Sequence, residues 1–281
     1  MCAPDPKNGT VTTNSPVTAA DTHDTLPGND PVSGSPPHEE KTRKGRNDQF
    51  NINFIQINLN KSKSATGDLA IFTKNKDKPI LLVQEPHVNG KNVLSRVSPC
   101  LKAIASRNKE TRPRACIFHH KSMSKQLWPK DSFTTGDCAV AQTQVDGRDT
   151  IIASCYMDRN DELCPPQAFR DIVEHAKTHK LPLITGSDVN AHNTAWKSRV
   201  CDKVAKERGD KLLEYILANN LFIENVGDTP TFDNGRWKNI IDLTITNQLG
   251  HNLVERWDVK ERTHGKNLSD HKYVIIQQQT S

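Results

Sequence analysis

The sequence predicts a layered α/β domain, because short apolar runs of strand length recur along it and amphipathic helical segments lie between them. The clearest unit is residues 165–184. Its first part carries Phe169, Ile172 and Val173 at helical spacing, after two prolines that suit a helix start. The apolar run 181–184 follows and has the length of a buried strand. A strand before this helix, at 150–156, completes a strand–helix–strand unit typical of layered α/β packing.

The first part of the chain differs in composition from the rest. Residues 1–48 are rich in proline and contain almost no large apolar side chains, so this segment cannot bury enough surface to offset the entropy of ordering. We therefore predict a disordered leader over residues 1–48 and a single folded domain over residues 49–281.

The bulk properties restrict the class of protein. The formal net charge is +5 and the pI is about 8.8, which suits a polyanionic partner without requiring one. The basic run 41–46 fits a nuclear address, a nucleic-acid arm or a solvated linker. The seven cysteines include no C-x-x-C pair, and no apolar run is long enough to span a bilayer. We expect a reducing, intracellular location, in the nucleus, and no membrane association.

The remaining elements follow from local patterns. Alternating polar and apolar residues predict a strand at 51–60, and apolar runs predict strands at 79–85, 114–118, 138–142 and 272–276. A helix is predicted after a cap at Thr66 to Asp68, and another over 211–217. Asp146-Gly147 indicates a hairpin turn, and Asn234-Gly235 indicates a second two-residue hairpin turn within 229–246. Gly186 and Ser187 are expected to stop the strand 181–184.

Polar side chains recur at the ends of these strands. Asp188, Asn190 and His192 alternate with apolar residues, so an extended segment would point all three the same way. Taken alone, Asp and Asn after a strand are more often turn and cap residues. Glu85 ends an apolar strand, where a metal ion, a Lys or Arg partner, or simple exposure would each explain a carboxylate. Asp242 lies between two apolar residues and requires a partner.

Together these positions form an ordered series that resembles the endonuclease/exonuclease/phosphatase superfamily. The series is Asn58, Gln84-Glu85, Tyr156, Asp188-x-Asn190, Ile241-Asp242 and Ser269-Asp270-His271. Further motifs resemble the endonuclease domain of non-LTR retrotransposons: 186–196, 207–209, 229–232, 241–246 and 268–271. One departure is Ser187-Asp-Val-Asn190 where the family usually has Gly-Asp-Phe-Asn. The resemblance implies a four-layered α/β sandwich (α+β by some schemes), in which two packed, mostly antiparallel β-sheets are flanked by helices.

The resemblance also implies roles. Glu85, with Asn60 and Asp270, would hold Mg²⁺, with Mn²⁺ as an alternative ion. Asp188 would orient or deprotonate the attacking water, and His271, held by Asp242, would contact the phosphate.

Three further side chains, those of Asn58, Tyr156 and Asn190, would donate hydrogen bonds to phosphate oxygens. Arg236, Trp237 and Lys238 at the hairpin tip would lie at the DNA surface; a solvated turn with a core-covering Trp is the alternative. The family motif also carries His192, grouped here with the DNA contacts, although its role does not follow from chemistry.

These roles predict a Mg²⁺-dependent endonuclease that nicks double-stranded DNA and leaves a 3′-hydroxyl to prime reverse transcription. Such a domain is normally linked to a reverse transcriptase. Because no polymerase segment follows in this sequence, we expect an isolated domain, a truncated copy or a domesticated one. The same fold also hosts phosphomonoesterases and abasic-site repair nucleases. A catalytically idle DNA-binding module is the alternative from another class.

Overall fold

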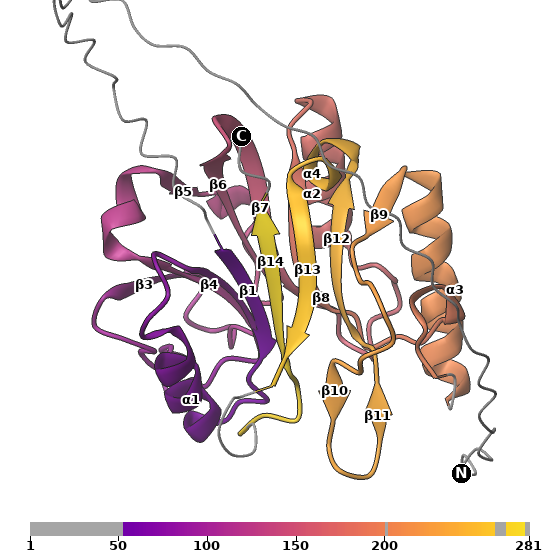
Figure 1. Cartoon of the computed structure of the whole chain (residues 1–281), viewed down its shortest axis with the longest axis horizontal. Coiled ribbons are helices and arrows are strands. Elements are labelled where there is room, and N and C mark those ends of the chain that lie inside the picture. Colours follow the sequence, from indigo (N-terminus) through magenta and orange to yellow (C-terminus); the bar gives the residue numbers. More distant parts are fainter. Residues whose placement is uncertain (1–52, 200–201, 262–267, 279–281) are drawn as a thin grey trace, which may run out of the picture. The chain divides into compact units, whose positions relative to one another are not determined.

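Two six-stranded sheets face each other in the computed structural model, which describes residues 53–199, 202–261 and 268–278 (Figure 1). The predicted leader, residues 1–48, lies outside the described residues. The first sheet has the order β13 (Val254–Lys260), β14 (Tyr273–Gln278), β1 (Asn53–Asn58), β2 (Ile80–Gln84), β4 (Ala115–His120) and β3 (Leu101–Ile104). The second has the order β5 (Leu127–Pro129), β6 (Cys138–Val145), β7 (Arg148–Tyr156), β8 (Leu183–Asp188), β12 (Asp242–Asn247) and β9 (Leu221–Ile223).

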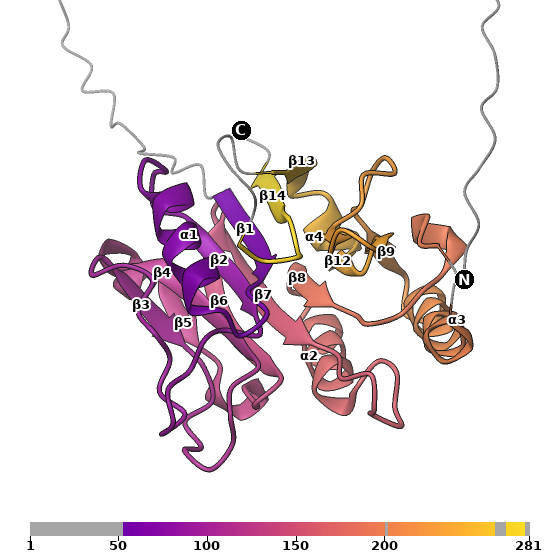
Figure 2. The same cartoon turned by 90° about the horizontal axis from the view of Figure 1, so that it is seen from below.

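Each sheet contains one parallel pair at its centre. The pair β1 and β2 is joined through α1 (Lys63–Thr73), and β7 and β8 are joined through α2 (Gln167–Thr178). The other pairings in the two sheets are antiparallel. The remaining helices are α3 (Lys203–Ala218) and the short α4 (Gln248–His251). The predicted four-layered sandwich of two mostly antiparallel sheets flanked by helices is therefore confirmed (Figure 2). None of the helices in the described ranges is both long and apolar enough to cross a membrane.

Both faces of each sheet are covered by apolar side chains. On β1, Phe54 packs between the two sheets with Ile152 and Ile184 of the second sheet. The neighbouring Ile55 faces the other way, into a cluster with Leu69 of α1. A sheet buried on both faces needs no polar alternation, which explains why the apolar residues of this strand do not alternate strictly.

A polar contact ties the two sheets together near the end of the strands. The Nε2 of Gln84 donates to Ser154 Oγ and to the Gly186 carbonyl, both at 2.9 Å. A Cβ at Gly186 would lie 3.0 Å from side-chain atoms of Gln56 and Leu82, so the sheets approach closely there. The prediction that Gly186 and Ser187 stop the strand is wrong, because β8 continues through both to Asp188.

Three other local predictions also differ from the structure, and one is the helix predicted over 211–217, since α3 begins at Lys203. Ser62 caps α1 by accepting from the Ala65 N–H at 3.1 Å, so the helix begins before the predicted cap at Thr66 to Asp68. The second hairpin consists of β10 (Phe232–Asp233) and β11 (Lys238–Asn239), and it protrudes below the sheets in Figure 1.

Its tip is longer than predicted because Asn234 Oδ1 accepts from the N–H groups of Arg236 and Trp237, at 3.0 and 2.7 Å. The strand β12 then starts a separate pairing in the second sheet.

Candidate active site

Asn58 connects the two sheets at the centre of the site. It is the last residue of β1 and is fully buried. Its Nδ2 donates to Asp188 Oδ2 at 2.7 Å and to Glu85 Oε2 at 3.3 Å. Asn58 ends β1 in one sheet and Asp188 ends β8 in the other. The hydrogen bond between them therefore shows that the parallel pairs β1–β2 and β7–β8 end at a common edge. Sites in layered α/β folds form at such strand ends.

A buried acid–histidine cluster lies beside Asn58. Asp188 and Asp242 are directly opposed in the β8–β12 pairing. The His271 Nδ1 contacts Asp242 Oδ2 at 2.8 Å and Oδ1 at 3.0 Å. One ligand atom from each of Asp188, Asp242 and His271 lies within 4.8 Å of the others. The predicted pairing of Asp242 with His271 is present, and Asp188 is adjacent.

Burial sets the charge state of this cluster. Burial raises the pKa of Asp188 to about 7, with His271 and the Asn58 hydrogen bond acting in the opposite direction. Burial by itself would lower the pKa of His271, but the carboxylates of Asp242 and Asp188 outweigh it and raise that pKa to about 9. His271 is therefore protonated at neutral pH. With Nδ1 donating to Asp242, its Nε2–H is the second donor of the imidazolium.

The three predicted metal ligands lie on neighbouring turns. The Nδ2 of Asn60 donates to Asp270 Oδ1 at 2.9 Å. Glu85 pairs with Lys61, whose Nζ lies 2.6 Å from Oε1. Of the explanations considered for Glu85, the structure shows a lysine partner.

The backbone at this position is unusual. Asn60, Lys61 and Glu85 all have positive φ, at +47°, +57° and +43°. Such conformations are costly for residues other than glycine and collect at functional sites.

The donor chemistry of this region fits a hard divalent cation. Glu85, Asn60 and Asp270 offer carboxylate and amide oxygens, the ligands that Mg²⁺ prefers. The ammonium of Lys61 forms an ion pair with Glu85, so this carboxylate already binds one cationic group. In the Asp188 cluster, by contrast, the His271 Nδ1 is already hydrogen-bonded to Asp242, so that nitrogen does not offer itself to a metal ion.

Tyr156 and Asn190 flank Asp188. Tyr156 is the β7 partner of Asp188 in the strand register. Burial raises the pKa of its phenol, so the hydroxyl stays neutral and can donate. Asn190 has a φ of +46°, its N–H donates to Asp188 Oδ1 at 3.2 Å, and its Nδ2 donates to the Met157 carbonyl at 3.2 Å. Asn190 thus orients Asp188 through its backbone N–H, while its side-chain amide is bonded to the Met157 carbonyl.

The hairpin tip is exposed and positively charged. The Arg236 guanidinium lies 5.6 Å from the Trp237 ring centroid, and Trp237 is 40% exposed. Lys238 pairs with Asp233 at 2.9 Å. His192 is half-buried, and its Nε2 lies 3.0 Å from the Nδ2 of Asn239 on β11. His192 therefore contacts the base of the hairpin, apart from its tip.

The hairpin is attached to the segment that carries His271. Phe232 pairs with His271 as an isolated bridge, and their rings meet edge to face at 5.1 Å. The Asp233 N–H donates to the Asp270 carbonyl at 2.7 Å. The base of the hairpin therefore contacts both a predicted metal ligand and the histidine.

Sequence reasoning missed two cations of the site, Lys61 and Arg114. Arg114 makes ion pairs with Asp137 and Asp158 beside Tyr156. No local pattern separates these two from the other 36 Lys and Arg residues of the chain, since 38 are present in total. Only their contacts identify them.

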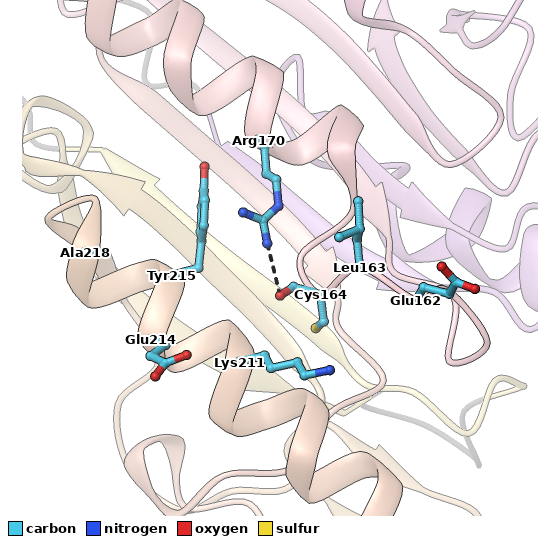
Figure 3. Close-up of a pocket in the computed structure, with 8 residues that line it drawn as sticks. All are labelled: Glu162, Leu163, Cys164, Arg170, Lys211, Glu214, Tyr215 and Ala218. Atoms are coloured by element: carbon cyan, nitrogen blue, oxygen red, sulfur yellow. Dashed lines mark hydrogen bonds between the residues drawn. The ribbon is translucent and has the colours of Figure 1, made fainter.

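A separate surface cavity of about 480 Å³ lies between α2 and α3 (Figure 3). Arg170 of α2 and Tyr215 of α3 line it, together with the loop around Cys164. It includes none of the predicted site residues.

Comparisons with known proteins agree with this geometry. Residues 150–275 match the model of the endonuclease–reverse transcriptase family. The putative 115 kDa protein in the type-1 retrotransposable element R1DM of Drosophila melanogaster is 26% identical over 235 residues, which is 80% of this chain and 22% of that protein. The chain thus spans about a fifth of the length of this curated relative.

Solved structures show the same fold. The endonuclease domain of TRAS1, a telomere-specific non-LTR retrotransposon, has a TM-score of 0.65 and 25% identity over 82% of this chain and 99% of that domain. The AP endonuclease LMAP from Leishmania major has a TM-score of 0.63 and 12% identity over 82% of this chain and 88% of that one, a likeness of fold. The fold is that of the AP-endonuclease-like endonuclease/exonuclease/phosphatase proteins. Within that class, the resemblance to the endonuclease domains of non-LTR retrotransposons is confirmed.

Proposed function

We propose that this domain is a Mg²⁺-dependent DNA endonuclease that nicks double-stranded target DNA and leaves a 3′-hydroxyl. The observation that carries the proposal is the meeting of Asn58, Asp188 and the Asp242–His271 pair at one strand edge. The family match and the likeness to the TRAS1 domain support the same activity.

The geometry supports a division of roles. Asn58 and the Asn190 N–H hold the two oxygens of Asp188, which is thereby oriented to accept a proton from the attacking water. The imidazolium of His271, fixed by Asp242, would donate from Nε2 to a phosphate oxygen. The neutral hydroxyl of Tyr156 is a further donor. The water oxygen bonds to phosphorus, the bond between phosphorus and the 3′ oxygen breaks, and the leaving oxygen takes a proton from water. The products are a 3′-hydroxyl and a 5′-phosphate.

A divalent cation, when bound by Glu85 with Asn60 and Asp270, would supply positive charge to the phosphate and to the leaving oxygen. Lys61 lies 2.6 Å from Glu85 and would adjust its position when that charge is added.

The biological role belongs to the same proposal. The nicked strand would prime reverse transcription by a polymerase in the parent polypeptide, and the domain would act on DNA in the nucleus. The retroelement origin of the curated relative, which is much longer than this chain, supports this view.

Supercoiled plasmid incubated with the protein tests the activity. We expect conversion to open circles with Mg²⁺ or Mn²⁺ and none with EDTA. Tight DNA binding without nicking would favour an idle binding module, and phosphomonoester hydrolysis without either would favour a phosphatase.

Substitution of Asp188 tests the site. Asp188→Asn keeps the shape but cannot take a proton, so we expect the nicking rate to fall about 100- to 10,000-fold with DNA affinity unchanged. Asp171→Asn, at an exposed carboxylate of α2, is the matched control. Nicking by Asp188→Asn at the wild-type rate would remove Asp188 from its role.

A further inference from the structure

Arg114 lies just before β4 and holds the turn that carries Glu85. Its carbonyl accepts from the Glu85 N–H at 2.7 Å, and its own N–H donates to the Gly136 carbonyl at 2.6 Å. Glu85 has a φ of +43°, a conformation that persists only where the surroundings enforce it. The backbone of Arg114 supplies part of that enforcement.

The Arg114 side chain is fixed by two carboxylates. Its Nε and Nη2 donate to the two oxygens of Asp137 at 2.5 and 2.6 Å, and its Nη1 donates to Asp158. The side chain is only 30% exposed. A bidentate contact plus a second acceptor leaves the guanidinium one orientation.

In that orientation the guanidinium covers Tyr156. Its central carbon lies 5.0 Å from the ring centroid. The two carboxylates bracket the same residue, because the Tyr156 N–H donates to the Asp137 carbonyl at 2.8 Å and Asp158 follows Tyr156 by two positions. The ring is therefore held from the side of the guanidinium as well as by its strand.

The ion pairs also remove negative charge from the edge of the site. Without the guanidinium, Asp137 and Asp158 would be two partly buried carboxylates without their cation, close to where a phosphate must bind. Lysine could neutralise one of them but could not reproduce the fork.

We propose that Arg114 is a positioning residue for phosphodiester cleavage: its backbone holds the Glu85 turn while its side chain holds the Tyr156 ring. The proposal rests on the proposed nuclease function, so one of its tests is independent of activity.

The independent test is ¹⁹F NMR of the full chain labelled with 3-fluorotyrosine. The chain has three tyrosines, Tyr156, Tyr215 and Tyr273, and Tyr156→Phe assigns the signal of interest. Arg114→Ala is expected to shift or broaden the Tyr156 signal and leave the Tyr273 signal in place.

A matched control exists in the cavity of Figure 3. There Arg170 lies 4.6 Å over the Tyr215 ring and donates to the Pro165 carbonyl at 2.9 Å. Arg170→Ala should move only the Tyr215 signal and leave nicking unchanged.

The kinetic test uses the same variants on plasmid DNA. Arg114→Ala should lower kcat for nicking about 10- to 100-fold, with DNA affinity within about threefold of wild type. Guanidinium chloride at millimolar concentration should restore at least part of the lost rate in Arg114→Ala, but not in Arg114→Lys, where the ammonium occupies the space. A residue that served only the fold would not respond to added guanidinium.

The outcomes separate the two proposals. If the wild-type protein does not nick DNA, the nuclease function fails, and the Tyr156 signal still decides whether Arg114 positions that ring. An unchanged Tyr156 signal together with a wild-type rate would overturn the inference. If Arg114→Ala does not fold, Arg114→Lys takes its place, with the same shift of the Tyr156 signal expected.

Discussion

Asp188 and His271 owe their chemistry to burial beside one another. Asp188 is 2% exposed and His271 is 5% exposed. The charge on each favours the ionised form of the other, because His271 lowers the pKa of Asp188 and Asp188 raises the pKa of His271. Both pKa values are raised from their usual range, that of Asp188 to about 7 and that of His271 to about 9, so a pH range remains between them. Here the carboxyl stays available as a base while the imidazole stays cationic.

These pKa values predict a plateau in the pH dependence of nicking. Asp188 must be ionised, and its pKa of about 7 means that the rate should rise about tenfold per pH unit below that value. His271 must be protonated, and its pKa of about 9 means that the rate should fall above that value. Single-turnover nicking from pH 5.5 to 10 measures both limbs. A rate that declines as pH rises through 7 would show that Asp188 acts in its protonated form.

At the scale of single residues, the sequence was informative wherever a polar side chain ended an apolar strand. Glu85 and Asp188 were predicted this way, whereas Asp242 was singled out because it lies between two apolar residues, and all three are buried at one edge. The lysine that pairs with Glu85 was not predicted, because Lys61 reaches it through a turn with two successive positive φ values.

At the scale of elements, the β10–β11 hairpin is the part of the site that can vary without altering the reacting groups. Its base is tied to His271 and Asp270, while its tip bears Arg236 and Trp237 in the open. A protruding Arg–Trp pair can enter a groove or wedge a base step.

We therefore expect Trp237→Ala to change where the protein nicks more than how fast. Mapping of nick positions on a plasmid by primer extension should show an altered distribution, with the total rate within about threefold of wild type. Trp128→Ala, at a tryptophan on β5 that is 45% exposed, is the matched control. Identical nick maps for Trp237→Ala and the wild type would exclude the tip from target choice.

The packing of α3 supplies a prediction about stability. The His192 N–H donates to the Ala205 carbonyl at 2.8 Å, which brings the backbone of His192 onto the helix. A Cβ at Gly209 would lie 2.1 Å from the His192 carbonyl oxygen, and backbone cannot move aside as a flexible side chain can.

Gly209→Ala should lower the free energy of unfolding by about 1–3 kcal/mol, measured by urea denaturation. Gly67→Ala is the control, since Gly67 lies in α1 with no atom within 4 Å of a built Cβ. There we expect a gain of about 0.5–1 kcal/mol from the better helix former. Equal effects at both positions would contradict the close approach of His192 to α3.

At the scale of the whole molecule, the site exists because the two sheets stack in one alignment. Gln84 of the first sheet donates to Ser154 and to the Gly186 carbonyl of the second, in the interior. The Asn58–Asp188 hydrogen bond crosses the same interface nearer the edge. Loss of the Gln84 hydrogen bonds should weaken both the packing of the two sheets and the Asn58–Asp188 hydrogen bond.

Gln84→Met keeps the approximate volume of the side chain and removes its donors. Leaving the buried Gly186 carbonyl without this partner should cost about 1–3 kcal/mol of unfolding free energy. We also expect slower nicking, because Asn58 and Asp188 lose their common frame. Thermal denaturation and plasmid nicking measure the two effects, and Gln144→Met on the exposed side of β6 is the control. A variant as stable as wild type would show that apolar packing alone aligns the sheets.

The sequence by itself determined where most of the central strands lie and the series of polar strand ends, because periodicity and turn chemistry act over a few residues. It therefore predicted the layered α/β class, the Asp146-Gly147 hairpin turn and, through the resemblance, the Asp242–His271 pair. The tertiary structure decided which of those ends meet. Asn58 and Asp188 are 130 positions apart and touch only because two sheets pack closely at a glycine, and Arg114 acquires its place through carboxylates far along the chain. Contacts of this kind depend on the alignment of whole sheets, which no local pattern encodes.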